Sequence, residues 1–180
     1  EPERATRHAL EMARAGADLV DVGGESTRPG SERVAAAEQI ERTRPVIEAV
    51  RRALDANGFA GVVLSIDTTR VSVAEAAVAA GAQMVNDISA GRDDPGMFEF
   101  VAGSGPALCL MHMQGEPATM QDNPLYDDPV AEVAAFLEAR LEAAAAAGIP
   151  AERLVIDPGI GFGKRTEHNL ALLAGLDRFL

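Results

Sequence analysis

Short apolar runs alternate with helical patterns along the whole chain, and this alternation limits the possible folds more than any other feature. The apolar runs predict strands at residues 18–22, 61–67, 83–89, 107–112 and 153–159. Helical recurrence predicts helices at residues 3–15, 34–56 and 72–80, and helices that begin near residues 94, 129 and 166, the last running to the end. Strands that alternate with helices form a parallel sheet, because each helix carries the chain back to the same end of the sheet. The sequence therefore predicts one α/β domain with five strands and six helices.

Proline and capping residues set several of the expected helix boundaries. Pro45 is expected to kink or divide the second helix. Asp94 followed by Pro95 is typical of an N-cap residue and the first residue of a helix. The same pattern recurs at Asp128 and Pro129, so we expect the fourth and fifth helices to begin at these pairs.

Polar residues follow all five predicted strands, and this helps to choose between two kinds of parallel α/β fold. A doubly wound sheet usually has a GxGxxG turn after its first strand, and the sequence lacks that turn. In a (β/α)8 barrel, functional side chains gather at the C-terminal ends of several strands. The sequence therefore favours a (β/α)8 barrel, although each polar residue taken singly is typical of a helix cap or a turn. The strand ends carry Asp21, Asp67, Asn86 with Asp87, His112 and Asp157.

Composition argues against several classes of partner. The net charge of −12 disfavours a broad surface for nucleic acid or for an anionic membrane. No apolar run approaches the roughly 20 residues of a membrane-spanning helix. The single cysteine, Cys109, lies in the apolar run ALCLM, which predicts a buried, inert thiol and is consistent with a reducing cytoplasm. The chain begins without methionine or a signal pattern, so we expect it to belong to a longer protein.

The polar strand ends suit a nitrogen-rich heterocycle better than a metal ion. Zinc sites favour His and Cys ligands, and His112 is the only histidine at a strand end. A carboxylate can accept two parallel hydrogen bonds from an N–H and an NH2 group on the edge of a heterocycle. The sequence therefore predicts small-molecule recognition at the strand ends, with metal binding and acid–base chemistry as alternatives.

Two glycine-rich segments adjoin these strand ends. In GESTRPG, residues 24–30, Arg28 is either a ligand for a phosphate or carboxylate or a solvated surface residue. In GIGFGK, residues 159–164, Lys164 adds a cation to a weak phosphate-loop pattern. Phe162 in the same segment is either a stacking face or a packed core residue.

Five motifs, taken in order, resemble a known family. They are DVGGESTRPG, SIDTTR, VNDISA, LMHMQGEPATMQDNPLYDD and DPGIGFGKRTEHN. Together they resemble the dihydropteroate synthases, transferases of the folate pathway, over nearly the whole chain. The resemblance implies a barrel enzyme that joins 6-hydroxymethyl-7,8-dihydropterin pyrophosphate to p-aminobenzoate with the help of Mg2+, releasing 7,8-dihydropteroate and pyrophosphate. It also implies a homodimer when the protein is complete, and a p-aminobenzoate site that binds sulfonamides.

The same resemblance implies roles for particular residues. Asp67, Asn86 and Asp157 match residues that hydrogen-bond the pterin ring. Asp67 and Asp157 are also expected to stabilise positive charge during catalysis, and Arg28 to assist the leaving group. The apolar wall of the pterin pocket matches Ile88, Cys109, Met111 and Phe162. The loop that closes over the substrates and helps to form the p-aminobenzoate site matches Thr27, Arg28 and Pro29.

The resemblance is incomplete at both ends. The family pattern begins with a strand and an NVTPDSF-like loop whose Asn binds metal, and it ends with Ser-Arg-Lys and Arg-x-His motifs; none of these occurs here. We therefore expect residues 1–180 to hold strands 2 to 6 of the eight barrel strands, with no metal ligand and with impaired activity for the chain alone. Two alternatives remain open, a methyltetrahydrofolate-binding methyltransferase domain and a non-catalytic pterin-binding paralogue.

Overall fold

The five predicted strands form one parallel sheet. The computed structural model describes residues 2–28 and 30–180. Its strands are β1 (Leu19–Gly23), β2 (Val63–Asp67), β3 (Met84–Asp87), β4 (Ala107–Met111) and β5 (Leu154–Asp157). They lie in the order β1-β2-β3-β4-β5, and neighbours pair in parallel. A doubly wound sheet reverses its strand order at a switch point, whereas a (β/α)8 barrel keeps chain order, so the predicted fold class is confirmed.

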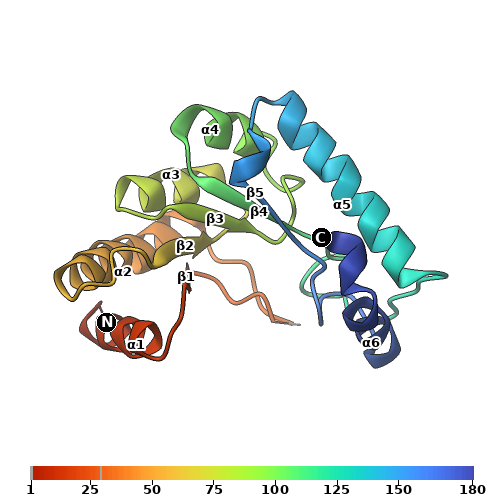
Figure 1. The fold of residues 1–180 in the computed structure, drawn as a ribbon, viewed down its shortest axis with the longest axis horizontal. Coiled ribbons are helices and arrows are strands. Elements are labelled where there is room, and N and C mark those ends of the chain that lie inside the picture. The colour runs from red at the N-terminus through yellow and green to blue at the C-terminus, as the bar shows by residue number, and fades with distance from the viewer. Residues whose placement is uncertain (1, 29) are drawn as a thin grey trace.

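Helices alternate with the strands and cover one side of the sheet. They are α1 (Pro2–Arg14), α2 (Ala36–Ala56), α3 (Val71–Ala79), α4 (Met97–Ser104), α5 (Pro129–Ala146) and α6 (Thr166–Ala174). Short 3-10 helices, Ala151–Arg153 and Leu176–Phe179, precede β5 and follow α6. Figure 1 shows the helices around the outer side of a curved sheet. In the part of the chain that the structure describes, none of them is long and apolar enough to cross a membrane.

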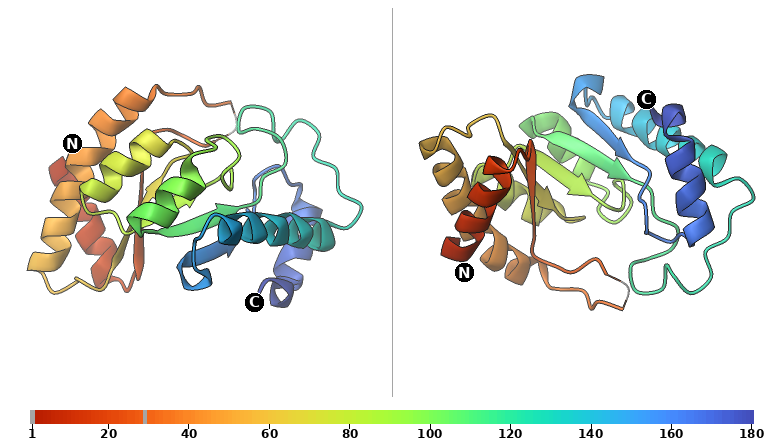
Figure 2. Two further views of the ribbon diagram at one scale, coloured as in Figure 1. Left: turned by 90° about the horizontal axis from the view of Figure 1, so that it is seen from above. Right: turned by 60° about the horizontal axis from the view of Figure 1, so that its bottom comes forward.

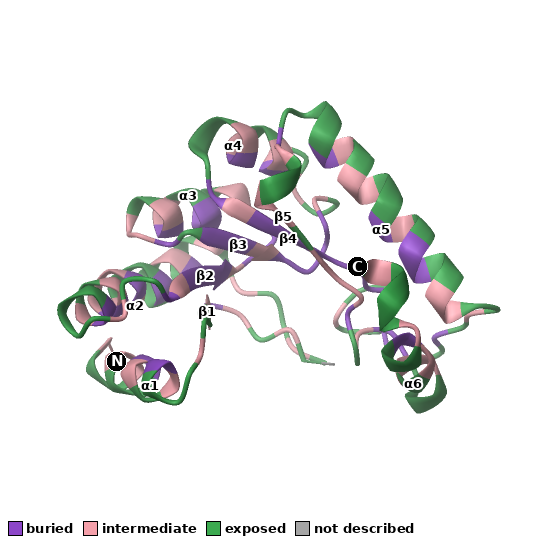
Figure 3. Cartoon of the chain, viewed as in Figure 1, coloured by how far each residue is buried: buried purple, intermediate pink, exposed green. Residues whose placement is uncertain are grey.

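The two faces of the sheet have different surroundings. Alternate strand residues pack outward against the helices, and Figure 3 shows the central strands β2, β3 and β4 largely buried beneath helices whose outer surfaces are exposed. Successive side chains of a strand point to opposite faces, so the residues between them point inward. The outward set in the main core is Val20, Leu64, Ile66, Val85, Leu108 and Leu110. The inward set includes Asp21, Ser65, Asp67, Asn86, Cys109, Met111 and Asp157.

The capping prediction is wrong for α4 and confirmed for α5. Helix α4 begins at Met97 with Gly96 as its N-cap, so Asp94 lies before the helix. Oδ1 of Asp94 accepts a hydrogen bond of 3.2 Å from the N–H of Gly96, and its Oδ2 accepts one of 3.0 Å from the N–H of Val71 at the start of α3. Asp128 is the N-cap of α5, and its Oδ1 accepts hydrogen bonds of 3.1 Å from two N–H groups of the first turn. The same residue pair therefore caps its own helix in one place and a neighbouring helix in the other.

Two further helix boundaries differ from the expectation. Helix α2 runs through Pro45 as one element of 21 residues. Proline removes one helical hydrogen bond, but the buried face of α2 continues on both sides of it, and this packing holds the helix together. Helix α6 ends at Ala174 instead of running to the end of the chain, because the chain turns at Gly175 into a 3-10 helix.

Candidate functional site

The sheet register brings the predicted polar residues together. Asp67 is aligned with Asn86, and Asn86 with Cys109, across three neighbouring strands. Met111 is aligned with Asp157 on β4 and β5. All five side chains point to the inner face, because they occupy the inward positions of their strands. The candidate site therefore lies on the inner face at the C-terminal ends of the strands, where a barrel fold carries its function.

Asp21, which the sequence places among the polar strand ends without a role of its own, joins this group. Its Oδ2 accepts a hydrogen bond of 3.0 Å from Nδ2 of Asn86, across the intervening strand β2. This contact fixes the orientation of the Asn86 amide and leaves its oxygen to accept a hydrogen bond from a ligand. The sequence signal was the polar residue within β1, which could also have been a turn former.

Asp67 is in an unfavourable environment for a negative charge. Burial, together with smaller contributions from the nearby carboxylates of Asp21, Asp87 and Glu25, raises the pKa of Asp67 to about 7. A carboxyl group with this pKa is partly protonated near neutral pH, so it can donate as well as accept a hydrogen bond. Perturbation by burial and by like charges is typical of functional sites.

An apolar cluster lies beside the carboxyl groups. Phe162, from the loop after β5, packs against buried side chains of the β3 and β4 ends and of the following loop. The buried members are Ile88, Met111, Met113 and Met120. Three of the predicted wall residues, Ile88, Met111 and Phe162, are therefore brought together. Flexible methionines and one aromatic ring form a surface that can adapt to a flat ligand.

Cys109 lies on the inner face and is buried, as predicted. Burial raises the pKa of its thiol to about 12, with further contributions from the carboxylates of Asp157, Asp21 and Asp87. The thiolate is the reactive form of cysteine, and it is scarce at this pKa. Cys109 therefore contributes apolar surface rather than a nucleophile.

The backbone after β5 orients Asp157. The N–H of Gly159 donates a hydrogen bond of 2.7 Å to Oδ1 of Asp157, and the N–H of His112 donates one of 2.9 Å to its carbonyl oxygen. A carboxylate has about four lone-pair sites, so one backbone contact leaves capacity for a ligand. The Asp-Pro-Gly turn thus orients the Asp157 carboxylate and leaves other lone pairs to accept hydrogen bonds from a ligand.

Lys164 is not an exposed phosphate-binding cation. The residue is only 3% exposed, and Nζ donates to the carbonyl oxygens of Gly159 and Phe162, both at 2.9 Å. The ammonium group therefore faces the interior of its own loop. The phosphate-loop interpretation of GIGFGK is wrong because the sequence pattern does not show where the lysine points.

Much of the loop after β1 is ordered by Glu25. Its Oε2 accepts hydrogen bonds from the N–H of Val34 at 2.6 Å and from Nε2 of Gln39 at 3.0 Å. Gly24 lies so close to α2 that an added Cβ would be 3.0 Å from the Cα of Gln39. The Gly-Glu pair in this motif is therefore explained by packing against α2.

The predicted loop residues have different positions. Thr27 lines a narrow cleft together with Asp67 and Ile88, so the structure unites these three candidates. Arg28 is exposed on the same loop, and its carbonyl oxygen accepts a hydrogen bond of 2.7 Å from the Ser31 hydroxyl. The prediction for Pro29 lies outside the described residues.

Arg33 connects the loop after β1 to two neighbouring loops. Its Nη2 lies 2.7 Å from Oδ2 of Asp93, and its Nη1 donates to the Thr69 hydroxyl at 3.4 Å. The hydrogen bond that Arg33 donates to Asp93 raises the pKa of Arg33. In both views of Figure 2, the described part of this loop extends toward the long loop between β4 and α5. We did not select Arg33 from the sequence, because only the fold brings its partners together.

Asp87, at the end of β3, has a structural role. It is fully buried, and Oδ1 accepts hydrogen bonds from the N–H and hydroxyl of Ser89 at 2.8 and 2.7 Å. Oδ2 accepts a third, of 2.8 Å, from the N–H of Gly91. This carboxylate therefore shapes the turn after β3, which is the turn interpretation of a strand-end aspartate.

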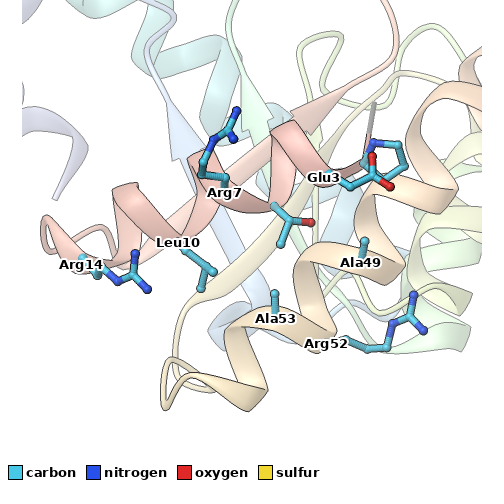
Figure 4. Close-up of a pocket in the computed structure, with 9 residues that line it drawn as sticks. Glu3, Arg7, Leu10, Arg14, Ala49, Arg52 and Ala53 are labelled. Carbon is cyan, nitrogen blue, oxygen red and sulfur yellow. The ribbon is translucent and has the colours of Figure 1, made fainter.

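The largest described cavity lies away from these residues. It has a volume of about 560 Å³ and is bounded by α1 and α2 on the helical layer (Figure 4). Leu10, Ala49 and Ala53 form its apolar floor, with Arg7 and Arg14 among the residues at its margin. It contains none of the sequence-predicted site residues.

Comparisons with known proteins identify the family of this chain. The family described as "Pterin binding enzyme" matches residues 1–180. Dihydropteroate synthase of Escherichia coli K12 is 43% identical over 175 residues, which is 97% of this chain and 60% of that protein. Two solved structures are similar over most of this chain. Yersinia pestis dihydropteroate synthase with a sulfonamide drug complex has a TM-score of 0.90 and 43% identity, covering 98% of this chain and 62% of the other. Xanthomonas albilineans dihydropteroate synthase with 4-aminobenzoic acid has a TM-score of 0.87 and 48% identity, covering 99% and 60%.

These matches cover nearly all of this chain but only part of each relative. The chain spans about 60% of the length of the curated relatives that match it first. Within that span the sequence matches one family, and the fold is similar to solved structures of dihydropteroate synthases. Since the family match runs from the first residue to the last, the chain belongs to the pterin-binding enzymes.

Proposed function

We propose that this chain provides the pterin-binding part of a dihydropteroate synthase. The reaction joins 6-hydroxymethyl-7,8-dihydropterin pyrophosphate to p-aminobenzoate and releases 7,8-dihydropteroate and pyrophosphate. The proposal is supported by family membership and by relatives 43% to 48% identical. The observation that carries it is the set of Asp67, Asn86 and Asp157 on one inner face beside an apolar cluster.

The polar side chains suit the edge of a pterin. Asp67, with a pKa of about 7, changes to its carboxylate form when a ligand presents N–H donors, because hydrogen bonds to the charged form lower its pKa. Asn86 offers its amide oxygen, since Nδ2 is used by Asp21. Asp157 supplies a second carboxylate, oriented by Gly159. Ile88, Met111, Phe162 and Cys109 would contact the apolar faces of the ring.

The proposed chemistry needs charge stabilisation rather than a protein nucleophile. The arylamine nitrogen attacks the methylene carbon attached to the pterin as the C–O bond to pyrophosphate breaks. The electron pair of that bond leaves with pyrophosphate, and the new secondary amine releases one proton to solvent. Positive charge develops on the pterin methylene, and the carboxylates of Asp67 and Asp157 stabilise it. Holding both substrates in line supplies much of the remaining rate enhancement.

The second substrate is assigned to the loop after β1. Thr27 lines the cleft that also contains Asp67, and Arg28 on the same loop provides a guanidinium group for an anion. We assign Thr27, Arg28 and Pro29 to the p-aminobenzoate side of the site, with Arg28 also assisting the departure of pyrophosphate. Sulfonamides are expected to compete for the same position.

Mg2+ is expected from the family resemblance. Among the described residues, no group of three or more His, Cys, Asp or Glu side chains could hold a metal ion. The side chains described here therefore do not supply a complete site for it, and no step above depends on the metal. When bound, Mg2+ supplies charge neutralisation for the departing pyrophosphate.

The central test is condensation by the complete gene product that contains these 180 residues. Formation of pteroate from both substrates, its loss in Asp67→Ala, and competition by a sulfonamide against p-aminobenzoate are expected. Methyl transfer from methyltetrahydrofolate to a corrinoid, without pteroate formation, would favour the methyltransferase alternative. Pterin binding without either activity would favour the non-catalytic paralogue.

The assembly and location of the protein belong to the same proposal. We propose that the complete protein is a cytoplasmic homodimer that binds small molecules and does not bind nucleic acid or membranes. Analytical ultracentrifugation of the complete gene product tests the dimer. Fractionation of the source cells tests the location.

A further inference from the structure

The chain has 16 Lys and Arg residues, and Lys164 is the only lysine among them. It is also among the few buried charged residues. A buried cation is costly unless its donors are satisfied. The ammonium group of Lys164 therefore needs hydrogen-bond acceptors in or near the loop after β5.

The contacts of Lys164 connect two loops of the candidate site. Nζ donates at 2.9 Å to the carbonyl oxygens of Gly159 and Phe162, in its own loop. It donates at 3.2 Å to the carbonyl oxygen of His112, which directly follows β4, and lies 3.0 Å from Nδ1 of that residue. An ammonium group has three donors in a compact tetrahedral arrangement, whereas arginine has a planar fork. This geometry explains why lysine is used here.

The charge states of the pair agree with these contacts. Burial lowers the pKa of Lys164 to about 8, which leaves it mostly protonated at neutral pH. Burial and the nearby cations of Lys164 and Arg92 lower the pKa of His112 to about 3, so its ring is neutral. A neutral imidazole can accept at Nδ1 from the ammonium group. The ring is held in place by an edge contact with Phe136, with the centroids 4.9 Å apart.

The two loops approach each other too closely for side chains at the contact. A Cβ atom on Gly159 would overlap the carbonyl oxygen of His112, and one on Gly163 would overlap that of Gln114. Both glycines have positive φ, +67° and +60°. The Tyr126 hydroxyl donates a further hydrogen bond of 2.9 Å to the carbonyl oxygen of Gly163. Lys164 therefore lies at the centre of a tightly packed junction.

This junction leads directly to two site residues. Gly159 accepts from Lys164 through its carbonyl oxygen and donates through its N–H to Oδ1 of Asp157. Phe162 accepts from Lys164 through its carbonyl oxygen while its ring packs in the apolar cluster. One ammonium group thus restrains both the carboxylate and the aromatic ring.

We propose that Lys164 is a positioning residue that holds Asp157 and Phe162 in place for the pterin. The inference rests on the proposed function, because it assigns these two residues to pterin binding. Lys164 has no direct contact with the ligand in this role. Its effect is expected on the pterin side of the reaction and not on the arylamine side, which belongs to the loop after β1.

Substitution in the complete gene product tests the role. Lys164→Met keeps much of the side-chain length and removes the three donors. We expect the KM for the pterin pyrophosphate to rise at least tenfold, while the KM for p-aminobenzoate at saturating pterin changes less than twofold. Arg165→Met is the matched control, since it removes the next cation, which is exposed and donates to Asn123 instead. An unchanged pterin KM in folded Lys164→Met, or an equal rise in both KM values, would overturn the proposal.

A second measurement needs no substitution and therefore does not depend on whether a variant folds. Amine acetylation followed by peptide mass spectrometry reports on Lys164, because Lys164 is the only lysine among these 180 residues and its peptide is resolved from those of any other lysine in the complete gene product. We expect labelling at least tenfold slower than in urea, and at least threefold slower again with saturating 6-hydroxymethyl-7,8-dihydropterin. If pterin binds but the labelling rate of Lys164 does not change, the positioning role of Lys164 is contradicted and the proposed function is not. Failure to bind pterin at all would contradict the proposed function itself.

Discussion

Asn86 donates a hydrogen bond of 3.0 Å from Nδ2 to Oδ2 of Asp21, which joins β1 to β3 across the inner face of β2. The two strands do not pair with each other, so this side-chain contact is a direct connection between them. It fixes the amide of a proposed pterin ligand and places a second carboxylate near Asp67. Asp21 thus has two separable effects, one through a hydrogen bond and one through its charge.

Substitutions at Asp21 are expected to separate these effects. Asp21→Asn keeps an acceptor for Asn86 and removes the charge that raises the pKa of Asp67, so the pH dependence of pterin binding moves to lower pH. Asp21→Ala causes the same shift and also frees the Asn86 amide, which lowers pterin affinity about fivefold to tenfold, or roughly 1 kcal/mol. Calorimetric titration with a pterin between pH 5 and 8 measures both. Equal affinities for the two variants would contradict the positioning role of Asp21.

Asp67 is expected to make the protein less stable as pH rises. Its pKa is about 7 in the folded protein and 3.8 in the reference state, so the folded state binds the proton more tightly. The free energy of unfolding therefore falls between about pH 4 and pH 7, by up to about 4 kcal/mol from this group. Asp67→Asn removes that dependence and is more stable than the parent protein at pH 8, but not at pH 4.

Urea unfolding at the two pH values, with parent and variant compared, measures this difference. Asp18→Asn is the control, since Asp18 is exposed at the start of β1 and its substitution leaves the difference unchanged. A variant that is less stable than the parent at pH 8 would show that Asp67 supports the fold instead of weakening it.

Two glycines of one loop are expected to differ in their tolerance of alanine. Both Gly159 and Gly161 have positive φ, +67° and +86°, so alanine is strained at either position by about 1 kcal/mol. Only Gly159 also faces a backbone oxygen, that of His112, whereas nothing lies within 4 Å of a Cβ added to Gly161. We expect Gly159→Ala to cost about 3 kcal/mol or more and Gly161→Ala about 1 kcal/mol. Chemical unfolding compares them, and similar losses would argue against the close packing of the two loops.

The Arg33 to Asp93 ion pair is expected to restrain the loop after β1 without adding much global stability. Both side chains are partly exposed, 45% and 36%, so their separation of 2.7 Å contributes less than about 1 kcal/mol. Asp93→Asn is expected to speed cleavage after Glu32 by a glutamate-specific protease severalfold, with a change in Tm of only a few degrees. High salt should speed cleavage of the parent protein and have less effect on the variant.

A matched variant controls for the loss of an exposed ion pair. Glu48→Gln removes the contact of 3.1 Å between Glu48 and Arg44 within α2, far in sequence from the loop. Loop cleavage in this variant is expected to equal that of the parent. A similar increase in the rate of loop cleavage in both variants would show that the Arg33–Asp93 ion pair does not specifically restrain the loop.

Local sequence rules predicted most elements, and they failed where a distant partner competed. The apolar runs located all five strands, because burial of a strand face requires such a run. Asp94 has the same sequence context as Asp128, yet its carboxylate caps α3, which lies 23 residues earlier in the chain. Pro45 has the sequence signal of a break, but the packed face of α2 outweighs it.

Some residues of the candidate site could likewise be predicted from the sequence, and others could not. Asp67, Asn86 and Asp157 could be selected from the sequence, since each stands at a strand end and strand ends of a parallel sheet lie on one edge. Asp21 and Arg33 could not be assigned roles, because their partners lie 65 and 60 residues away, and the sequence did not show that Lys164 also contacts His112, which lies 52 residues away. Such contacts depend on which strands become neighbours and on the path of each loop.

The alternation of strands and helices and the positions of the polar strand ends can be predicted from the amino-acid sequence alone. These follow from local periodicity and composition, which act over a few residues. Folding is needed before Asp67 is desolvated among other carboxylates, and before Lys164 faces carbonyl oxygens instead of an external anion. Burial and hydrogen bonding are properties of groups brought together by folding, so the pKa of a carboxyl group and the direction of a lysine are fixed only when the loops have packed.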